Sequence, residues 1–282
     1  MKFTKMQGLG NDYLYVFSEE EPQNPAQDSI RLSDRHFGAG SDGMIWILPS
    51  KVADFKMRIF NADGSEAMMC GNGIRCVGKY VYDRKHTDKT ELDIETLSGI
   101  KHLRLHVEDG AVKSVEVDMG KAVVSAPLLL DLSLELSGDD CLNLHASRNG
   151  SDIMLTCVPV DMGNPHAVIF CDDADNVPVE AVGSIIEHMT DAFPDGVNVE
   201  FVSLKSETEM RMRVWERGSG VTMACGTGSC ASVAAAVTHE YCQADVPVSV
   251  VLDGGTLTVT VAKDNEVLMA GPAAFVFEGE EI

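Results

Sequence analysis

The chain has 282 residues, of which 45% are apolar and 23% are charged, and its formal net charge is −22. This is the composition of an ordinary globular protein, and the length suffices for two domains of about 140 residues each. An acidic chain with scattered lysines and arginines is not expected to bind nucleic acid, and neither a membrane-spanning stretch nor a signal peptide is apparent, so we expect a cytoplasmic protein.

The first glycine-rich segment, GAGSDG at 38–43, fits the spacing of a dinucleotide-binding loop. That loop requires a strand before it and a helix after it, whereas the next residues, MIWIL, have the pattern of a strand. We therefore expect no nucleotide there. The sequence contains no Walker phosphate loop either, and no lysine lies in a context that singles it out for a Schiff base.

The next segment, FNADGSEAMMCGNGIRC at 60–76, places Cys70 before a Gly-Asn-Gly tripeptide. Apolar residues then follow at helical spacing, as Ile74, Val77 and Val81. The pattern predicts that Cys70 lies at the amino end of a helix.

Strands are predicted on either side of the middle of the chain. Residues 90–119 alternate between apolar and polar side chains in three runs that turns separate. Residues 246–271 repeat this pattern, with turns at DGG and KDN. Between these regions, VEAVGSIIEHMTDAF at 179–193 has the apolar spacing of an amphipathic helix.

The last motif, WERGSGVTMACGTGSC at 215–230, resembles the first one at an offset of 155 residues. When Cys225 is aligned with Cys70, the flanking methionines and glycines coincide as well. The residues that follow are apolar or small on every side, as in a helix enclosed by protein. One motif in each half indicates a duplicated unit, and the irregular order of strands and helices indicates an α+β fold.

A cysteine at the start of a helix is close to unpaired backbone amides, which favour the thiolate and lower the thiol pKa. Glycines beside it let the amides approach a bound carboxylate. Two such thiols can act on opposite faces of one carbon, the first removing a proton and the second delivering one. The matched pair Cys70 and Cys225 therefore predicts inversion of a stereocentre.

The other cysteines have spacings that do not suit a metal site, and a chain of this size without a signal peptide is expected to keep its thiols reduced. We expect no metal. Small buried apolar positions are predicted for Cys141, Cys157, Cys171 and Cys242.

The sequence closely resembles the diaminopimelate epimerases. Five segments carry the resemblance in the order of the family: FTKMQGLGNDYLYV, NADGSEAMMCGNGIRC, DMGNPHAVIF, FPDGVNVEFV and RVWERGSGVTMACGTGSCASVAAAV. It implies an isomerase that interconverts LL- and meso-diaminopimelate, without cofactor or metal, in lysine and peptidoglycan biosynthesis. It also implies a homodimer.

The resemblance implies two similar α/β domains, each with strands around a central helix, and an active site between them. The expected domains are 1–118 with 269–282, carrying Cys70, and 119–268, carrying Cys225, because the last strand of this fold returns to the first domain.

Residue roles follow from the resemblance where positions match. The catalytic thiols are Cys70 and Cys225, and their ionisation is adjusted by His166 and Glu216. Backbone amides that hold the carboxylate at the reacting carbon belong to Gly71, Asn72, Gly226 and Thr227. The rest of the substrate is contacted by Asn11, Asn61, Asn164, Asn198, Glu216 and Arg217, of which Arg217 suits a bidentate grip on the far carboxylate.

Two positions depart from the family pattern. Many relatives have glutamine at the position of Gly43 and an acidic residue at that of Val221. These departures affect expected substrate preference and leave the reaction type unchanged.

Several other functions remain open at this point. Proline racemases and hydroxyproline epimerases use a similar thiol pair, but they typically have histidine at the position of Asn72. Phenazine-biosynthesis isomerases share the architecture without the two thiols. A protein of a different class, a thiol redox sensor, would join the two cysteines reversibly, and a noncatalytic binding module would need neither thiol.

Overall fold

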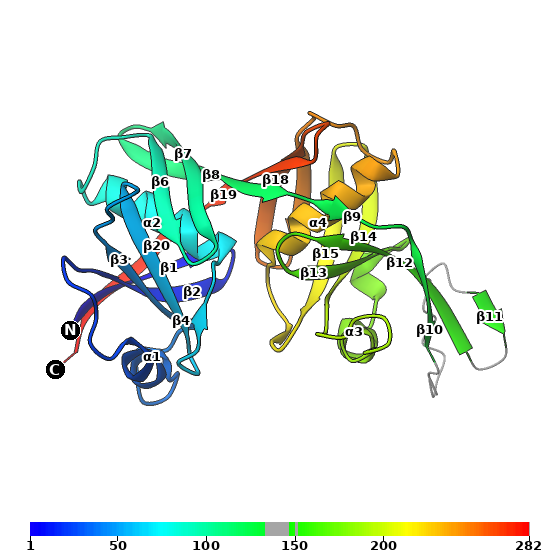
Figure 1. Cartoon of the computed structure of the whole chain (residues 1–282), viewed down its shortest axis with the longest axis horizontal. Coiled ribbons are helices and arrows are strands. Elements are labelled where there is room, and N and C mark those ends of the chain that lie inside the picture. The colour runs from blue at the N-terminus through cyan, green and yellow to red at the C-terminus, as the bar shows by residue number, and fades with distance from the viewer. Residues whose placement is uncertain (133–146, 150–151, 282) are drawn as a thin grey trace. The chain divides into compact units, whose positions relative to one another are not determined.

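The computed structural model describes residues 1–132, 147–149 and 152–281. They form an α+β protein rich in strands that divides into two compact units, Met1–Asp118 with Ala270–Ile282, and Met119–Met269 (Figure 1). The predicted class is confirmed. The chain crosses the boundary between the units within β8 (Ala111–Lys121) and again within β19 (Glu266–Pro272).

The first unit contains the helices α1 (Pro25–Ser33) and α2 (Gly71–Asp83). Besides β8, its strands are β1 (Lys2–Gly8), β2 (Asn11–Phe17), β3 (Gly43–Leu48), β4 (Phe55–Asn61), β5 (Glu66–Ala67), β6 (Glu91–Thr96), β7 (Gly99–Glu108) and β20 (Ala274–Glu280). The carboxyl-terminal β20 pairs antiparallel with β1, so both ends of the chain lie in this unit.

The second unit contains a short 3₁₀ helix, η1 (Ala174–Asn176), and the helices α3 (Val179–Glu187) and α4 (Gly226–Thr238). Besides β19, its strands are β9 (Val123–Val124), β10 (Leu128–Leu132), β11 (Ser147–Asn149), β12 (Asp152–Asp161), β13 (Pro165–Phe170), β14 (Asn198–Ser206), β15 (Glu209–Glu216), β16 (Gly220–Val221), β17 (Val248–Leu252) and β18 (Gly255–Val261).

The two units repeat one topology. In the series β1-β2-β3-β4-β6-β7, successive pairs are antiparallel, parallel, antiparallel, parallel and antiparallel. The series β12-β13-β14-β15-β17-β18 has the same sequence of pairings. The parallel pairs are joined through α1 and α2 in one unit and through α3 and α4 in the other. The predicted duplication is therefore confirmed by the strand pairings.

Each unit encloses one helix among its strands. The apolar face of α2, with Ile74, Val77 and Val81, has no solvent exposure and packs toward β1, β2 and β7. Because α4 consists mainly of Ala, Gly, Ser and Val, it is buried on nearly every side, and β12, β13, β14 and β18 pack against it. Both predicted helices are confirmed.

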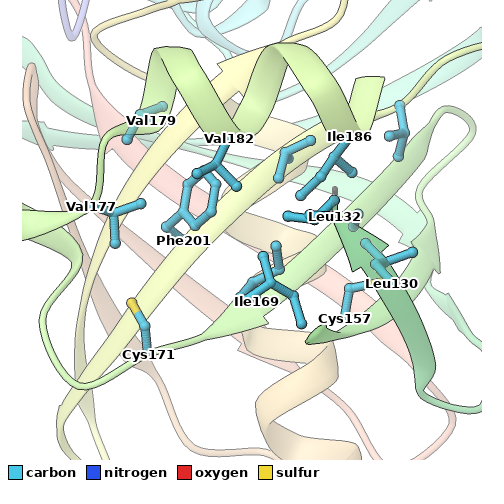
Figure 2. Close-up of a cluster of buried hydrophobic side chains, with 14 of the residues drawn as sticks. Leu130, Leu132, Cys157, Ile169, Cys171, Val177, Val179, Val182, Ile186 and Phe201 are labelled. Carbon is cyan, nitrogen blue, oxygen red and sulfur yellow. The ribbon is translucent and has the colours of Figure 1, made fainter. Parts of the chain in front are cut away.

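The third predicted helix is shorter than expected. The amphipathic pattern predicts a helix over 179–193, but α3 ends at Glu187, and the backbone amide of His188 caps it. After Glu187, the backbone amides of His188 and Met189 donate to carbonyls three residues back, so the chain tightens into turns. Phe193 still packs into the buried cluster below α3, together with Val182 and Ile186, and Figure 2 shows α3 lying over that cluster.

The predicted strands and buried cysteines are also found. Both three-strand runs are present, as β6, β7 and β8 and as β17, β18 and β19, and Cys157, Cys171 and Cys242 are buried. Cys141 lies outside the described residues. In the described parts of the chain, no helix is long and apolar enough to cross a membrane.

Because Cys157 is buried, we expect the free energy of unfolding to decrease at alkaline pH. Burial raises the pKa of this thiol to about 12, whereas an unfolded cysteine titrates near ~8.5. The Cys157 thiol therefore contributes its full stabilisation below the pKa of the unfolded state. This contribution is lost as the pH rises toward the pKa of the folded state. Cys157→Ala should be less stable than the wild type at pH 7 by about 1 kcal/mol. At pH ~10.5 this deficit should be reversed, because the wild type then loses about 2.5 kcal/mol that the variant retains.

Urea unfolding at both pH values measures this difference. The control is Val158→Ala, which removes a neighbouring buried side chain that does not titrate. Its deficit should be equal at both pH values. A Cys157→Ala deficit that also stays constant would show that the thiol ionises equally in both states.

Candidate active site

Both motif cysteines cap the amino end of an enclosed helix. Cys70 has φ −135° and ψ 119°, and its Sγ accepts a hydrogen bond from the amide of Gly73 at 3.4 Å. Cys225 has φ −117° and ψ 115°, and its Sγ accepts from the amide of Gly228, also at 3.4 Å. The two thiols therefore occupy equivalent positions in the repeat, although the groups around them differ.

The surroundings of Cys70 come from β2. Its thiol donates to Oδ1 of Asn11 at 3.4 Å, and the side-chain amide of Asn11 donates to Oδ2 of Asp42 at 2.7 Å. Asn11 is thereby held with its oxygen toward the thiol. Tyr13 also lies beside Cys70, and burial, with the thiol as a further cause, raises the pKa of its phenol well above the usual range. Tyr13 is therefore a neutral group at physiological pH.

The first turn of α2 covers a buried arginine. Arg75 has no solvent exposure, and its guanidinium donates to the carbonyl of Gly71 at 3.1 Å, to Oδ1 of Asn72 at 2.8 Å and to the carbonyl of Pro272 at 3.2 Å. The Asn72 side chain consequently points toward Arg75, inside the unit. Asn61, at the end of β4, donates its side-chain amide to Ser65 Oγ at 3.0 Å.

A buried hydrogen-bonded pair lies under the first turn of α4. Nδ1 of His166 is 2.7 Å from Oε1 of Glu200, and neither side chain is exposed. Nε2 of the same ring is 3.1 Å from Oδ1 of Asn164. The amide nitrogen of Asn164 donates to the hydroxyl of Thr227 at 3.4 Å, and that hydroxyl is 3.6 Å from the thiol of Cys225.

The pKa of Cys225 is raised, which corrects the expectation that the helix start lowers it. Burial is the largest cause, and the nearby carboxyl groups of Glu216 and Glu200 add to it. The hydrogen bonds from Thr227 and Gly228 act in the opposite direction and are outweighed. Cys225 is therefore a protonated thiol at neutral pH. The pKa of Glu216 is also raised by burial, although Thr222 donates a hydrogen bond to its carboxyl.

Asn198 and Arg217 lie beside each other at one end of the antiparallel pair β14 and β15. Oδ1 of Asn198 accepts from the backbone amide of Arg217 at 3.0 Å, and its nitrogen donates to the carbonyl of Pro165 at 3.0 Å. The exposed guanidinium of Arg217 donates to the carbonyl of Asp195 at 2.8 Å. The Arg217 side chain is thus fixed at one edge while its remaining donors face solvent.

Most of the predicted site residues gather at the two helix starts. In the first unit the structure brings Asn11 to Cys70, and in the second it brings Asn164, Thr227 and Glu216 to Cys225. Three buried groups near the thiols were not predicted from sequence: Tyr13, Arg75 and Glu200. A charged residue within an otherwise apolar strand or helix face is the signal that could have found Arg75 and Glu200.

Comparison with known proteins gives the family. The chain matches the sequence pattern described as Diaminopimelate epimerase over residues 3–125 and 158–276. It is 51% identical to the diaminopimelate epimerase of Agathobacter rectalis and 49% identical to that of Methanococcus maripaludis, and in both cases 99% of each chain is covered. The chain belongs to the diaminopimelate epimerase family.

Solved structures with the same fold extend beyond the diaminopimelate epimerases. A phenazine biosynthesis protein of the PhzF family from Bacillus anthracis has a TM-score of 0.74 at 19% identity, covering 100% of this chain and 99% of its own. A probable proline racemase from Agrobacterium radiobacter has a TM-score of 0.71 at 13% identity, covering 100% of this chain and 92% of its own. At such identities the likeness shows the fold alone.

The two departures from the diaminopimelate epimerase pattern have different settings. Gly43 opens β3, where a Cβ atom would lie 2.2 Å from the carbonyl oxygen of Phe60, so the present backbone leaves no room for a side chain. Val221 lies in β16 and is 44% exposed.

Asn198 occupies the position in the second unit that Gly43 has in the first, since each opens the strand after the first crossover helix.

Proposed function

We propose that this protein converts LL-2,6-diaminopimelate to meso-diaminopimelate by removing and redelivering an α proton, in the pathway to lysine and peptidoglycan. Membership of the family supports the substrate. The observation that carries the mechanism is the matched pair of cysteines, each capping an enclosed helix in one copy of a repeated topology. Inversion at carbon requires an acid and a base on opposite faces, and two thiols can exchange these roles with the direction of the reaction.

The helix starts supply the groups that stabilise developing charge. We assign the backbone amides of Gly71, Asn72, Gly226 and Thr227 to the carboxylate at the reacting carbon. Loss of the α proton moves negative charge onto that carboxylate, and amides fixed at a helix start stabilise it without reorganising.

The surroundings of Cys225 set the protonation state of its thiol. Cys225 carries its proton at neutral pH because burial and two carboxyl groups raise its pKa. Cys70 and Cys225 act as acid and base in turn, depending on which stereoisomer is bound, and Glu216 and His166 adjust the ionisation of the thiols.

Polar side chains of both units are assigned to the rest of the substrate. These are Asn11, Asn61, Asn164, Asn198, Glu216 and Arg217. Each amide except that of Asn61 is fixed by at least one partner from a neighbouring strand or loop of its unit. Groups fixed in this way bind one stereoisomer of the distal centre better, because a mismatched ligand leaves them unpaired at about 1 to 3 kcal/mol each.

The oligomeric state and the cellular location are also part of the proposed function. We expect a homodimer in the cytoplasm, as the family resemblance implies. Sedimentation analysis at micromolar protein concentration would test the dimer, and a single species of 30.4 kDa would contradict it.

The deciding experiment incubates the reduced protein with LL-diaminopimelate in deuterated water, without added pyridoxal phosphate or metal. The expected result is deuterium at the α carbon together with a mixture that contains the meso isomer. Exchange with proline or hydroxyproline alone would instead indicate a racemase of the related family. Absence of exchange with every amino acid would overturn the proposal, and a reversible Cys70–Cys225 disulfide under mild oxidation would then point to a redox protein.

A further inference from the structure

The buried pair of Glu200 and His166 keeps both ring nitrogens of the histidine engaged. Nδ1 faces Oε1 of Glu200, and Nε2 faces Oδ1 of Asn164. Both facing atoms are oxygens, which accept hydrogen bonds, so each of the two contacts needs its own proton. One proton lies between Nδ1 and the carboxylate, and the other is donated by Nε2 to Asn164. Glu200 supplies the acceptor that makes this possible.

This pair fixes which way the Asn164 amide points. Because Oδ1 of Asn164 accepts from His166, its NH₂ group must face the other way, where it donates to Thr227. The Thr227 hydroxyl in turn lies beside the Cys225 thiol. A continuous series of hydrogen bonds therefore joins Glu200 to the thiol.

The repeat shows that the fold itself does not need this charge. In the strand register, the first unit has Tyr13 where the second has His166, and Ile45 where the second has Glu200. Both Ile45 and Glu200 lie directly under the first turn of their helix, against Gly73 and Gly228 respectively. An isoleucine therefore satisfies the packing at this position of the fold.

Retaining a carboxylate at this position also has an energetic cost. Glu200 has no solvent exposure, and in the described part of the chain its Oε2 has no hydrogen-bond partner. An unsatisfied buried oxygen destabilises the folded state, and an aliphatic side chain would avoid that penalty. A costly group that packing does not require indicates a role in function.

We propose that Glu200 is a positioning residue for the proposed epimerisation, acting through His166 to hold the Asn164 amide with its NH₂ group toward Thr227. This rests on the proposed function, in which Asn164 contacts the substrate and Thr227 helps to bind the carboxylate. Glu200 also lies close enough to Cys225 to contribute to the raised pKa of that thiol.

Glu200→Gln tests the proposal with little change in shape. With glutamine the pair has lost a charge, so the ring keeps one proton. It either donates from Nδ1 to the glutamine oxygen, which leaves Nε2 as an acceptor, or keeps Nε2–H and accepts at Nδ1 from the glutamine NH₂. Asn164 is then no longer held in one orientation, because in the first state it must present its NH₂ to His166 and its oxygen to Thr227. We expect kcat/KM for diaminopimelate to fall about 10- to 100-fold, as for other residues that orient a ligand-binding group.

A double-mutant cycle separates positioning from simple destabilisation. Asn164→Ala should lose a similar factor, and Glu200→Gln combined with Asn164→Ala should be no worse than either alone within about twofold, because both changes remove one function. A double variant whose loss is the product of the two single losses would overturn the proposal. If Glu200→Gln fails to fold, His166→Gln carries the same cycle.

The control is Ser203→Ala on the same strand. Ser203 is buried, and its hydroxyl also has no partner among the described residues, but no hydrogen bond links it to Asn164 or Cys225. This variant should keep wild-type kcat/KM.

A proton NMR measurement tests the pair independently of any activity. Both ring N–H protons of His166 should appear as exchange-protected downfield signals that are absent from His166→Gln, and Glu200→Gln should retain at most one of them. If the wild type shows both signals but does not epimerise diaminopimelate, the proposed function fails while the buried pair remains. If the enzyme is active but neither signal depends on Glu200, the positioning role is wrong.

Discussion

Replacing either Cys70 or Cys225 with alanine is expected to reduce epimerisation of diaminopimelate by about 10⁴-fold, the upper range for loss of a general acid or base. Each thiol lies at the start of an enclosed helix, and the same unit offers no second thiol at that helix start. Water cannot replace either thiol efficiently, because it lacks both the pKa and the fixed position. The measurement is the LL-to-meso conversion rate of each purified variant.

Isotope exchange distinguishes this mechanism from one with a single base. A variant with one remaining thiol can still remove a proton from its own face and return deuterium to that face. Cys70→Ala and Cys225→Ala should therefore each exchange at most one stereoisomer, with retention, and the two variants should prefer opposite isomers. Inversion at the wild-type rate in both variants would contradict the two-thiol mechanism.

Two other cysteines provide matched controls. Cys76 lies in α2 and Cys230 in α4, and both are fully buried away from the helix starts. Cys76→Ala and Cys230→Ala should lower stability by about 1 kcal/mol but keep kcat/KM near that of the wild type. Large losses of activity in these controls would mean that the effect of removing Cys70 or Cys225 reflects folding.

Periodic patterns and repeated motifs made much of the fold predictable. Alternation over 90–119 and 246–271 gives the strands, and glycine-flanked cysteines before apolar runs give α2 and α4. The end of α3 was predicted six residues late, because apolar spacing continues to Phe193 although the chain has already turned. Burial of Phe193 is compatible with either conformation, so periodicity alone could not place that boundary.

The ionisation of the site was much less predictable. A helix start near a thiol is visible in sequence, and it favours the thiolate. Besides burial, the groups that raise the pKa of Cys225 are Glu216, nine positions away in sequence, and Glu200, which reaches the site only because β14 pairs with β13 and lies under α4. Sequence patterns identify donors at a helix start, whereas desolvation and charges from other strands depend on the three-dimensional packing.

The second large effect is expected at Arg217, which we assign to the distal carboxylate of the substrate. Asp195 already holds one edge of the guanidinium through its carbonyl, and Asn198 fixes the Arg217 backbone amide. A side chain fixed in this way loses little entropy when it binds a carboxylate through two parallel hydrogen bonds. Arg217→Lys keeps the charge but not the fork, and kcat/KM should fall about 10²- to 10³-fold, equivalent to roughly 3 to 4 kcal/mol.

The control is Arg213→Lys on the same strand. Arg213 contacts Asp253 and the carbonyl of Val177, and no hydrogen bond links it to the residues near Cys225. Its conservative replacement should leave kcat/KM nearly unchanged.

Lysine as a substrate shows whether Arg217 reads the distal carboxylate. Lysine has the same backbone and a terminal ammonium but lacks that carboxylate, so the wild type should strongly prefer diaminopimelate. Arg217→Met should lose most of this preference, since it removes the group that distinguishes the two molecules and leaves the thiols in place. If the variant becomes slower with diaminopimelate yet discriminates against lysine as strongly as the wild type, another residue must bind the distal carboxylate. Arg217 would then act by supporting Asp195 and Asn198, and its replacement would slow the reaction by displacing Asn198 at the start of β14.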